Sequence, residues 1–186
     1  MNNIKYLLGL VVILCLLSMN SFNYVRDTKM STKSKDIIGS YMKSNDKKIF
    51  DDSIAMIEIP KISLKKYLYS IDSNKNNIDI NLEIMKESDM PDVKKGNLII
   101  GGHSGNSKVS YFNNLYKLEI GDIVNIYYED YVYTYILVDT YIDDKDGRIT
   151  INRNYNTEVL TLFTCKNNDK NNYLVLIFEQ RIVDDN

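Results

Sequence analysis

The stretch LTLFTCKNND, residues 160–169, carries an apolar run that ends on a cysteine and continues into a polar loop. Such a run, followed by turn-forming residues, is typical of a buried strand. The chain has two cysteines, Cys15 and Cys165, and Cys15 lies in an apolar N-terminal segment. Cys165 is therefore predicted to be an unpaired thiol at a strand end. In an extracytoplasmic domain such a thiol needs an explanation, because oxidation threatens it.

The chain also has a single histidine, His103, in the glycine-rich stretch GGHSG that follows the apolar residues 97–100. Histidine exchanges a proton near neutral pH, and a cysteine–histidine pair is the minimum for a thiol nucleophile. Each residue alone has a plainer interpretation, as a small buried side chain for the cysteine and a surface side chain for the histidine. Both follow apolar strands, however, so both are expected at strand ends, where loops carry chemistry on a rigid scaffold.

Composition limits the other classes of function. The chain has 186 residues, of which 44% are hydrophobic, which suits one folded domain with an appendage. The formal net charge of −2 shows no basic excess, so nucleic acid is not expected as a partner. One cysteine and one histidine are too few for a zinc site, and no paired ligand spacing exists. We therefore expect no metal and no other cofactor.

The N-terminal residues predict a membrane anchor. Residues 6–25 contain no charge, and at about 1.5 Å per residue they can just cross a hydrocarbon core of about 30 Å. No small-x-small cleavage site follows, which favours an uncleaved signal anchor over residues 1–26 rather than a cleaved signal peptide. Residues 27–52 are polar and charged and are predicted to form a stalk, with the folded domain at 53–186.

The orientation of this anchor follows from two opposing arguments. Lys5 precedes the segment, whereas Arg26, Lys29, Lys33 and Lys35 follow it. A strict count of positive charges would keep the C-terminal side in the cytoplasm. Long domains translocate largely regardless of that count. We therefore expect a single-pass protein of the cell membrane with its folded domain outside the cell.

Hydrophobic periodicity in the domain predicts mostly strands. The expected strands are 54–59, 64–71, 97–100, 123–128, 131–142, 159–164 and 173–179. A short helix is expected at 78–86, where Ile78, Leu82 and Met85 recur at helical spacing, and a helical turn at 111–118. Many short strands with few helices favour a closed or nearly closed β-barrel, because a flat open sheet would leave Tyr- and Ile-rich edges exposed.

Three blocks of this sequence resemble the sortase family, the membrane-anchored cysteine transpeptidases of Gram-positive bacteria. They are GNLIIGGHSG, then YFNNLYKLEIGD, then LTLFTC, which occur in the family's order and spacing. The resemblance spans roughly residues 54–179. It implies an eight-stranded β-barrel with a groove and short helices.

The resemblance also implies a chemistry. Cys165 would be the nucleophile that attacks the Thr–Gly bond of an LPxTG-like sorting signal on a secreted protein, and His103 would protonate the leaving amine. The acyl-thioester would pass to an amine of a peptidoglycan precursor or a pilin lysine. Thr164 and Ser104 would contact the substrate, and the loop after Ile142 would help to set specificity.

One family feature is missing from its usual place. Sortases carry an arginine early in the strand after the catalytic cysteine, and it stabilises the developing oxyanion. Here the strand is expected to start at Tyr173, and Arg181 lies eight residues further on, roughly 26 Å away at about 3.3 Å per residue. Arg181 is therefore expected at the far end of the strand. The replacements considered are Tyr173, Lys170, Arg148 and Arg153.

The missing arginine leaves alternatives to a transpeptidase. A thiol hydrolase would use the same pair but release the peptide. A sortase-like domain with weak or no activity would serve as a binding module for surface proteins. The L,D-transpeptidases are set aside because their histidine and cysteine are almost adjacent, whereas His103 and Cys165 are 62 positions apart, since 165 − 103 = 62.

Overall fold

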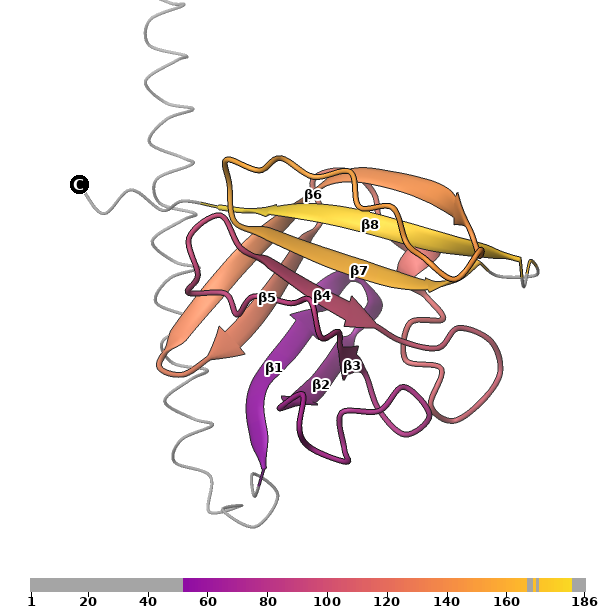
Figure 1. Cartoon of the computed structure of the whole chain (residues 1–186), viewed down its shortest axis with the longest axis horizontal. Helices are drawn as coiled ribbons and strands as arrows, with labels where there is room; N and C mark the ends of the chain where they lie inside the picture. Colours follow the sequence, from indigo (N-terminus) through magenta and orange to yellow (C-terminus); the bar gives the residue numbers. More distant parts are fainter. Residues whose placement is uncertain (1–51, 167–168, 170, 182–186) are drawn as a thin grey trace, which may run out of the picture. The chain divides into compact units, whose positions relative to one another are not determined.

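One mixed sheet accounts for all the strands in the described part of the chain (Figure 1). The computed structural model describes residues 52–166, 169 and 171–181. The strands are β1 (Ser53–Ile59), β2 (Leu64–Tyr69), β3 (Glu83–Ile84), β4 (Asn97–Gly101), β5 (Ile123–Tyr128), β6 (Tyr131–Asp144), β7 (Val159–Cys165) and β8 (Asn172–Gln180). Two 3-10 helices, η1 (Pro60–Ile62) and η2 (Leu115–Lys117), complete these elements. All seven predicted strands are confirmed, and the helical turn expected at 111–118 narrows to η2.

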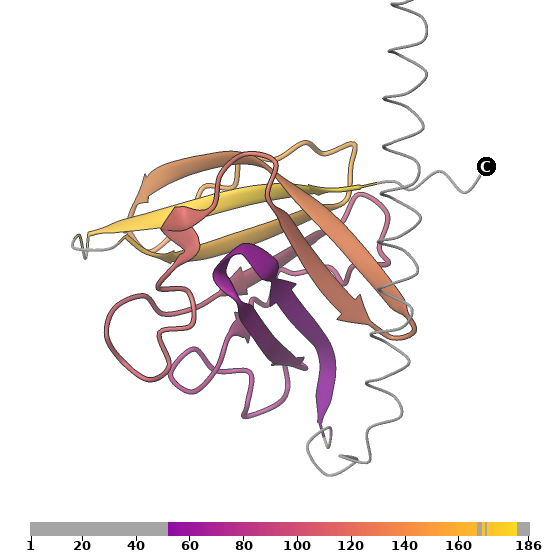
Figure 2. The same ribbon diagram turned by 180° about the vertical axis from the view of Figure 1, so that it is seen from behind.

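The strand order is β2-β1-β5-β6-β8-β7-β4-β3. Every pairing is antiparallel except that of β4 with β7, which is parallel. The first and last strands of this order, β2 and β3, lie side by side in both views (Figures 1 and 2). The side chain of the buried Asn81, just before β3, donates a 2.9 Å hydrogen bond to the carbonyl of Tyr67 in β2. The sheet thus curls into the nearly closed barrel that the strand pattern predicted.

Strand β7 is covered on both faces. Leu160 and Leu162 belong to the core inside the barrel, whereas Val159 and Phe163 belong to a second cluster on the outer face. Side chains alternate between faces along a strand, so a strand that is buried on both sides carries apolar residues on both faces. This explains why the sequence before Cys165 shows no alternation of apolar and polar residues.

The prediction of a short helix at 78–86 is wrong. Only one turn forms, in which the amides of Ile80 and Asn81 donate to the carbonyl of Asn77 at 3.1 and 2.8 Å. The chain then enters β3, where Glu83 pairs with Gly101. The side chain of Asn76 bonds both the amide and the carbonyl of Ile84, at 2.7 and 2.9 Å. Pairing with β4 and the side chain of Asn76 together take the backbone groups that a continuing helix would have used.

The predicted membrane segment at 6–25 lies outside the described residues, as does the predicted stalk apart from Asp52. Within the described part, no helix has the length and apolar character needed to cross a membrane.

Candidate active site

The parallel strands β4 and β7 bring the predicted cysteine and histidine to one edge of the barrel. Gly101 is paired with Phe163 in the ladder, and the amide of Gly102 donates a further 3.2 Å bond to the carbonyl of Phe163. His103 follows two residues after β4, and Cys165 is the last residue of β7. Because parallel strands end at the same edge, the two positions come to the same edge although they are 62 positions apart in the sequence, since 165 − 103 = 62.

Two side-chain hydrogen bonds tie these strand ends together. Ser104 Oγ donates to the carbonyl oxygen of Cys165 at 2.6 Å, and the buried Thr164 Oγ1 donates to the carbonyl oxygen of Gly102 at 2.7 Å. The hydroxyls of both residues expected to contact substrate therefore bond the backbone beside the thiol and the imidazole. They fix the position of the two strand ends relative to one another.

The two consecutive glycines before His103 permit close packing on both faces of β4. A Cβ at Gly101 would lie 2.7 Å from Cζ of Phe163, and one at Gly102 would lie 2.7 Å from Cδ2 of Phe112. Both distances are shorter than any tolerated carbon contact, so a side chain at either position would displace an aromatic ring. Gly101 thus lets the Phe163 ring lie against the chain that leads to His103, and Gly102 does the same for the Phe112 ring.

The imidazole of His103 contacts an acidic residue in this structure. Its Nε2 lies 3.1 Å from Oδ1 of Asp79, and the side chain is 37% exposed. Asp79 lies in the turn before β3, where its amide bonds the side chain of Asn77 at 2.8 Å. Sequence analysis did not identify Asp79, because nothing local marks an exposed aspartate in a turn as a histidine partner.

The thiol of Cys165 is free and half-buried. It contacts the ammonium group of Lys145, whose Nζ lies 3.5 Å from Sγ. Cys165 is paired with Tyr173 across β7 and β8, and the same ammonium group lies 5.3 Å from the centre of the Tyr173 ring. Lys145 was missed by sequence analysis. It lies 20 residues before the cysteine, and only the strand register brings it close.

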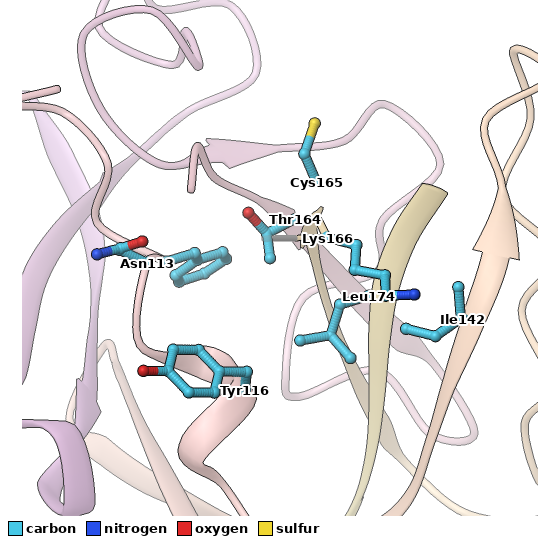
Figure 3. A pocket seen from close by; sticks show the side chains of 8 residues that line it. Asn113, Tyr116, Ile142, Thr164, Cys165, Lys166 and Leu174 are labelled. Carbon is cyan, nitrogen blue, oxygen red and sulfur yellow. The ribbon is translucent and has the colours of Figure 1, made fainter. Parts of the chain in front are cut away.

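A pocket of about 440 Å³ adjoins the cysteine (Figure 3). Its lining is mostly apolar and comes from η2, the preceding turn, β6, β7 and β8: Phe112, Asn113, Tyr116, Ile142, Thr164, Cys165, Lys166 and Leu174. Thr164 and Leu174 are paired across β7 and β8 and form one side. The thiol of Cys165 points away from Leu174 and Tyr116 in Figure 3, as alternation along the strand requires. Cys165 therefore lies at the boundary between this pocket and the outer face of the sheet.

Arg181, and Arg153 from the replacements considered, lie at the ends of β7 and β4 that are far from Cys165 and His103. The amide of Arg181 bonds the carbonyl of Thr134 at 2.8 Å, beyond the pairing of Val159 with Glu179, so Arg181 is at the end of β7 opposite Cys165, as expected. Arg153 Nη1 donates to the carbonyl of Lys95 at 3.0 Å, before the start of β4.

Of the two remaining charged replacements, the structure describes only Arg148. Arg148 lies in a turn in which its amide bonds Asp146 Oδ1 at 3.1 Å. Lys170 lies outside the described residues. Within the described ranges, no group of three His, Cys, Asp or Glu residues is arranged to hold a metal ion.

A protein-family model described as "Sortase domain" matches residues 57–181. This match includes all three sequence blocks that resemble the family. No curated protein sequence matches the chain.

Solved structures give the same fold. Sortase A from Corynebacterium diphtheriae is 22% identical with a TM-score of 0.62, and the match covers 72% of this chain and 63% of that one. Sortase C1 from Streptococcus agalactiae is 23% identical with a TM-score of 0.60, covering 72% and 70%. A Clostridium perfringens sortase D5 transpeptidase is 23% identical with a TM-score of 0.60, covering 70% and 80%. The chain thus spans less than two thirds of the corynebacterial relative.

Proposed function

Because this chain belongs to the sortase family, we propose that it is a cysteine transpeptidase that cleaves an LPxTG-like sorting signal and transfers the protein to an amine. The observation that carries the proposal is the joining of the two strand ends. Ser104 and Thr164 bond across β4 and β7 and hold His103 and Cys165 at one edge. A nucleophile and a base on rigid neighbouring strands are the arrangement that covalent catalysis needs.

The first half-reaction forms an acyl-enzyme. The thiolate of Cys165 attacks the carbonyl carbon of the Thr–Gly bond and forms a tetrahedral oxyanion. As the oxyanion collapses, the carbon–nitrogen bond breaks, and the protonated imidazole of His103 donates its proton to the leaving amine. The part of the sorting signal that follows the cleaved bond leaves as an amine, and the secreted protein stays attached to Sγ as a thioester.

The second half-reaction transfers the acyl group. An incoming amine attacks the thioester carbon, and the neutral imidazole of His103 accepts the proton that the amine loses. The carbon–sulfur bond breaks, and Cys165 returns as a thiolate. Nε2 of His103 lies 3.1 Å from Oδ1 of Asp79 in this structure, so the imidazole must leave this contact or share it to reach the amine. The acceptor is an amine of a peptidoglycan precursor or a pilin lysine.

The pocket beside Cys165 suits an apolar side chain of the sorting signal. Its volume of about 440 Å³ and its lining by Phe112, Tyr116, Ile142 and Leu174 favour an aliphatic residue. Ile142 comes from the end of β6, so the loop that follows it helps to set the preference.

The proposal includes a membrane anchor at residues 6–25 with the folded domain outside the cell. Its support is the uncharged segment in the sequence. Protease added to intact cells should then digest the domain, whereas full protection would contradict this orientation.

Intact-protein mass spectrometry tests the activity. The full-length protein is incubated with a panel of LPxTG-like peptides, with and without an amine acceptor, beside the Cys165→Ala and His103→Ala variants. We expect an acyl adduct that requires Cys165 and a transfer product that requires the amine. An adduct that only hydrolyses would indicate a thiol hydrolase.

A binding module is the second candidate, because no arginine occupies the usual place early in β8. It predicts peptide binding without an adduct, together with unchanged display of surface proteins in Cys165→Ala cells.

A further inference from the structure

Lys145 is the described residue whose charge lies against the thiol, at 3.5 Å from Sγ of Cys165. We propose that Lys145 is a catalytic residue, which stabilises the Cys165 thiolate and then the oxyanion that forms on the carbonyl it attacks. Only the oxyanion role rests on the proposed function. The stabilisation of the thiolate is a property of the protein without substrate.

The strand register places Lys145 beside the cysteine. Asp143, Tyr173 and Cys165 form one row across β6, β8 and β7. Lys145 is two positions beyond Asp143 and therefore leaves the chain on the same face. Its side chain crosses the Tyr173 ring, with Nζ 5.3 Å from the ring centre, and ends at the thiol. The aromatic face supports the ammonium group through a cation–π contact.

The backbone around Lys145 is held by several hydrogen bonds. The amide of Lys145 donates to the carbonyl of Asn171 at 2.8 Å, which extends the β6–β8 ladder by one step. The loop that follows is fastened to β6 by Tyr141, whose hydroxyl donates to the carbonyl of Thr150 at 2.6 Å. Burial raises the pKa of Tyr141, so this donor keeps its proton. Lys145 therefore starts from an ordered position, although its side chain reaches solvent.

Two of the three carboxylates near Lys145 in sequence accept hydrogen bonds from backbone amides. Asp143 Oδ2 accepts from the amide of Thr150 at 2.6 Å, and Asp146 Oδ1 accepts from that of Arg148 at 3.1 Å. Lys166, which is adjacent to the cysteine in sequence, directs its ammonium group to Asp169 at 3.6 Å. Among the described residues, Lys145 forms no ion pair with a carboxylate. Its charge is therefore available to the thiolate.

The chemistry follows from this position. A cation beside a thiol favours the thiolate, which is the nucleophile. When Sγ attacks a carbonyl carbon, the negative charge develops on the oxygen bonded to that same carbon. This oxygen is therefore two bonds from Sγ, and the ammonium group beside Sγ can donate a hydrogen bond to it. Charge stabilisation at the place where charge develops accelerates the step. Stabilisation of the oxyanion requires a cation beside Sγ. That cation can come from Lys145 after β6 instead of an arginine in β8.

The test compares Lys145→Met with Lys145→Arg in the full-length protein. Methionine keeps much of the length of lysine and removes its charge, whereas arginine restores a cation. Lys94→Met serves as the control, because Lys94 is an exposed lysine near the start of β4, at the end away from His103. The first measurement is the rate of Cys165 alkylation by iodoacetamide at pH 7, with Cys165 distinguished from Cys15 by peptide mapping. The second is peptide turnover.

We expect Lys145→Met to slow alkylation about fivefold, as removal of a charge near 4 Å in a solvated site implies, and Lys145→Arg to stay within about twofold of the parent. Turnover number should fall about tenfold or more in Lys145→Met, with KM nearly unchanged, because the oxyanion exists only in the transition state. Unchanged alkylation in Lys145→Met overturns the thiolate role. A change in KM alone overturns the oxyanion role.

The two measurements distinguish failure of the transpeptidase proposal from failure of the Lys145 proposal. If the parent protein forms no adduct with any peptide but Lys145→Met still slows alkylation, the transpeptidase proposal and the oxyanion role fail and the thiolate role stands. If the parent turns over peptide and Lys145→Met matches it in both measurements, Lys145 has no catalytic role.

Discussion

Ser104 Oγ donates a 2.6 Å hydrogen bond to the carbonyl oxygen of Cys165. The bond joins the residue after His103 to the backbone of the proposed nucleophile, which lies 61 positions further along the sequence. A short bond between two strand ends restricts how far the imidazole and the thiol can separate. Catalysis by a pair of this kind depends on such restriction, because small displacements of reacting groups cost large factors in rate.

Replacement of Ser104 by alanine should reduce turnover more than stability. Loss of one hydrogen bond costs about 1 kcal/mol, which urea unfolding will measure. We expect peptide turnover to fall about fivefold or more because the two strand ends lose a connection. Ser107→Ala is the matched control, since Ser107 bonds Ser110 in an exposed loop. Equal turnover in the two variants would contradict a positioning role for Ser104.

Two buried threonines of β7 allow stability and activity to be separated. Thr164 bonds the carbonyl of Gly102 next to His103, whereas Thr161 bonds Asn97 Oδ1 at 3.0 Å, nearer the other end of β4. Valine at either position removes a buried hydrogen bond and should cost about 1–3 kcal/mol. Only Thr164→Val should also lower the turnover of protein that remains folded. Urea unfolding and single-turnover assays under native conditions provide the comparison.

Addition of a methyl group at Gly101 should destabilise the barrel, because its Cβ would meet the Phe163 ring at 2.7 Å. Overpacking of this kind costs about 1–3 kcal/mol. Phe163→Leu removes the ring and should recover part of the loss in the double variant. A double-mutant cycle by thermal or urea unfolding measures the coupling. Additive effects of the two changes would show that the ring is not the source of the strain.

Asp79→Asn tests the contact with the histidine. The carboxylate is 80% exposed and 3.1 Å from His103 Nε2, so solvent weakens the interaction. We expect a loss of about two- to fivefold in kcat/KM at neutral pH, with the protein equally stable. Asp72→Asn is the control, since Asp72 is an exposed aspartate of the same connection. A parent-like kcat/KM in Asp79→Asn would show that the contact between Asp79 and His103 does not contribute to the reaction.

The carboxylate of Asp122 should make the free energy of unfolding depend on pH. Asp122 Oδ2 accepts the amide of Glu119 at 2.7 Å and lies 2.8 Å from the ammonium group of Lys61. Partial burial opposes ionisation, but the hydrogen bonds from Lys61 and Glu119 outweigh it and lower the pKa of Asp122 below its usual 3.8. A lowered pKa stabilises the fold above the unfolded value, and that stability is lost as pH falls through the folded value.

Asp122→Asn should therefore lower the urea midpoint at pH 7, and the difference from the parent should shrink as the pH falls below about 3.8. Unfolding curves at several pH values measure it. A difference in urea midpoint that stays constant down to pH 2 would show that the loss of stability does not come from the charge of Asp122.

Most of the fold was predictable because strands and turns are coded locally. Apolar runs bounded by polar turns located seven strands, and the position of Cys165 at the end of β7 followed from the run before it. The segment 78–86 was predicted incorrectly because Leu82 and its neighbours fit helical spacing equally well. The competing signal, pairing of Glu83 with Gly101, comes from a residue 18 positions away, and no local pattern contains it.

The sequence by itself determined which residues can do chemistry: one histidine, one cysteine outside the apolar N-terminal segment, and the polar residues next to them. The tertiary structure alone decided what surrounds them. Parallel pairing of β4 with β7 joins Ser104 to Cys165, and the register of β6, β8 and β7 brings Lys145 across Tyr173 to the thiol. The physical reason is that strand pairing is formed by hydrogen bonds between distant backbone groups, and a shift by one residue would turn each of these side chains to the other face.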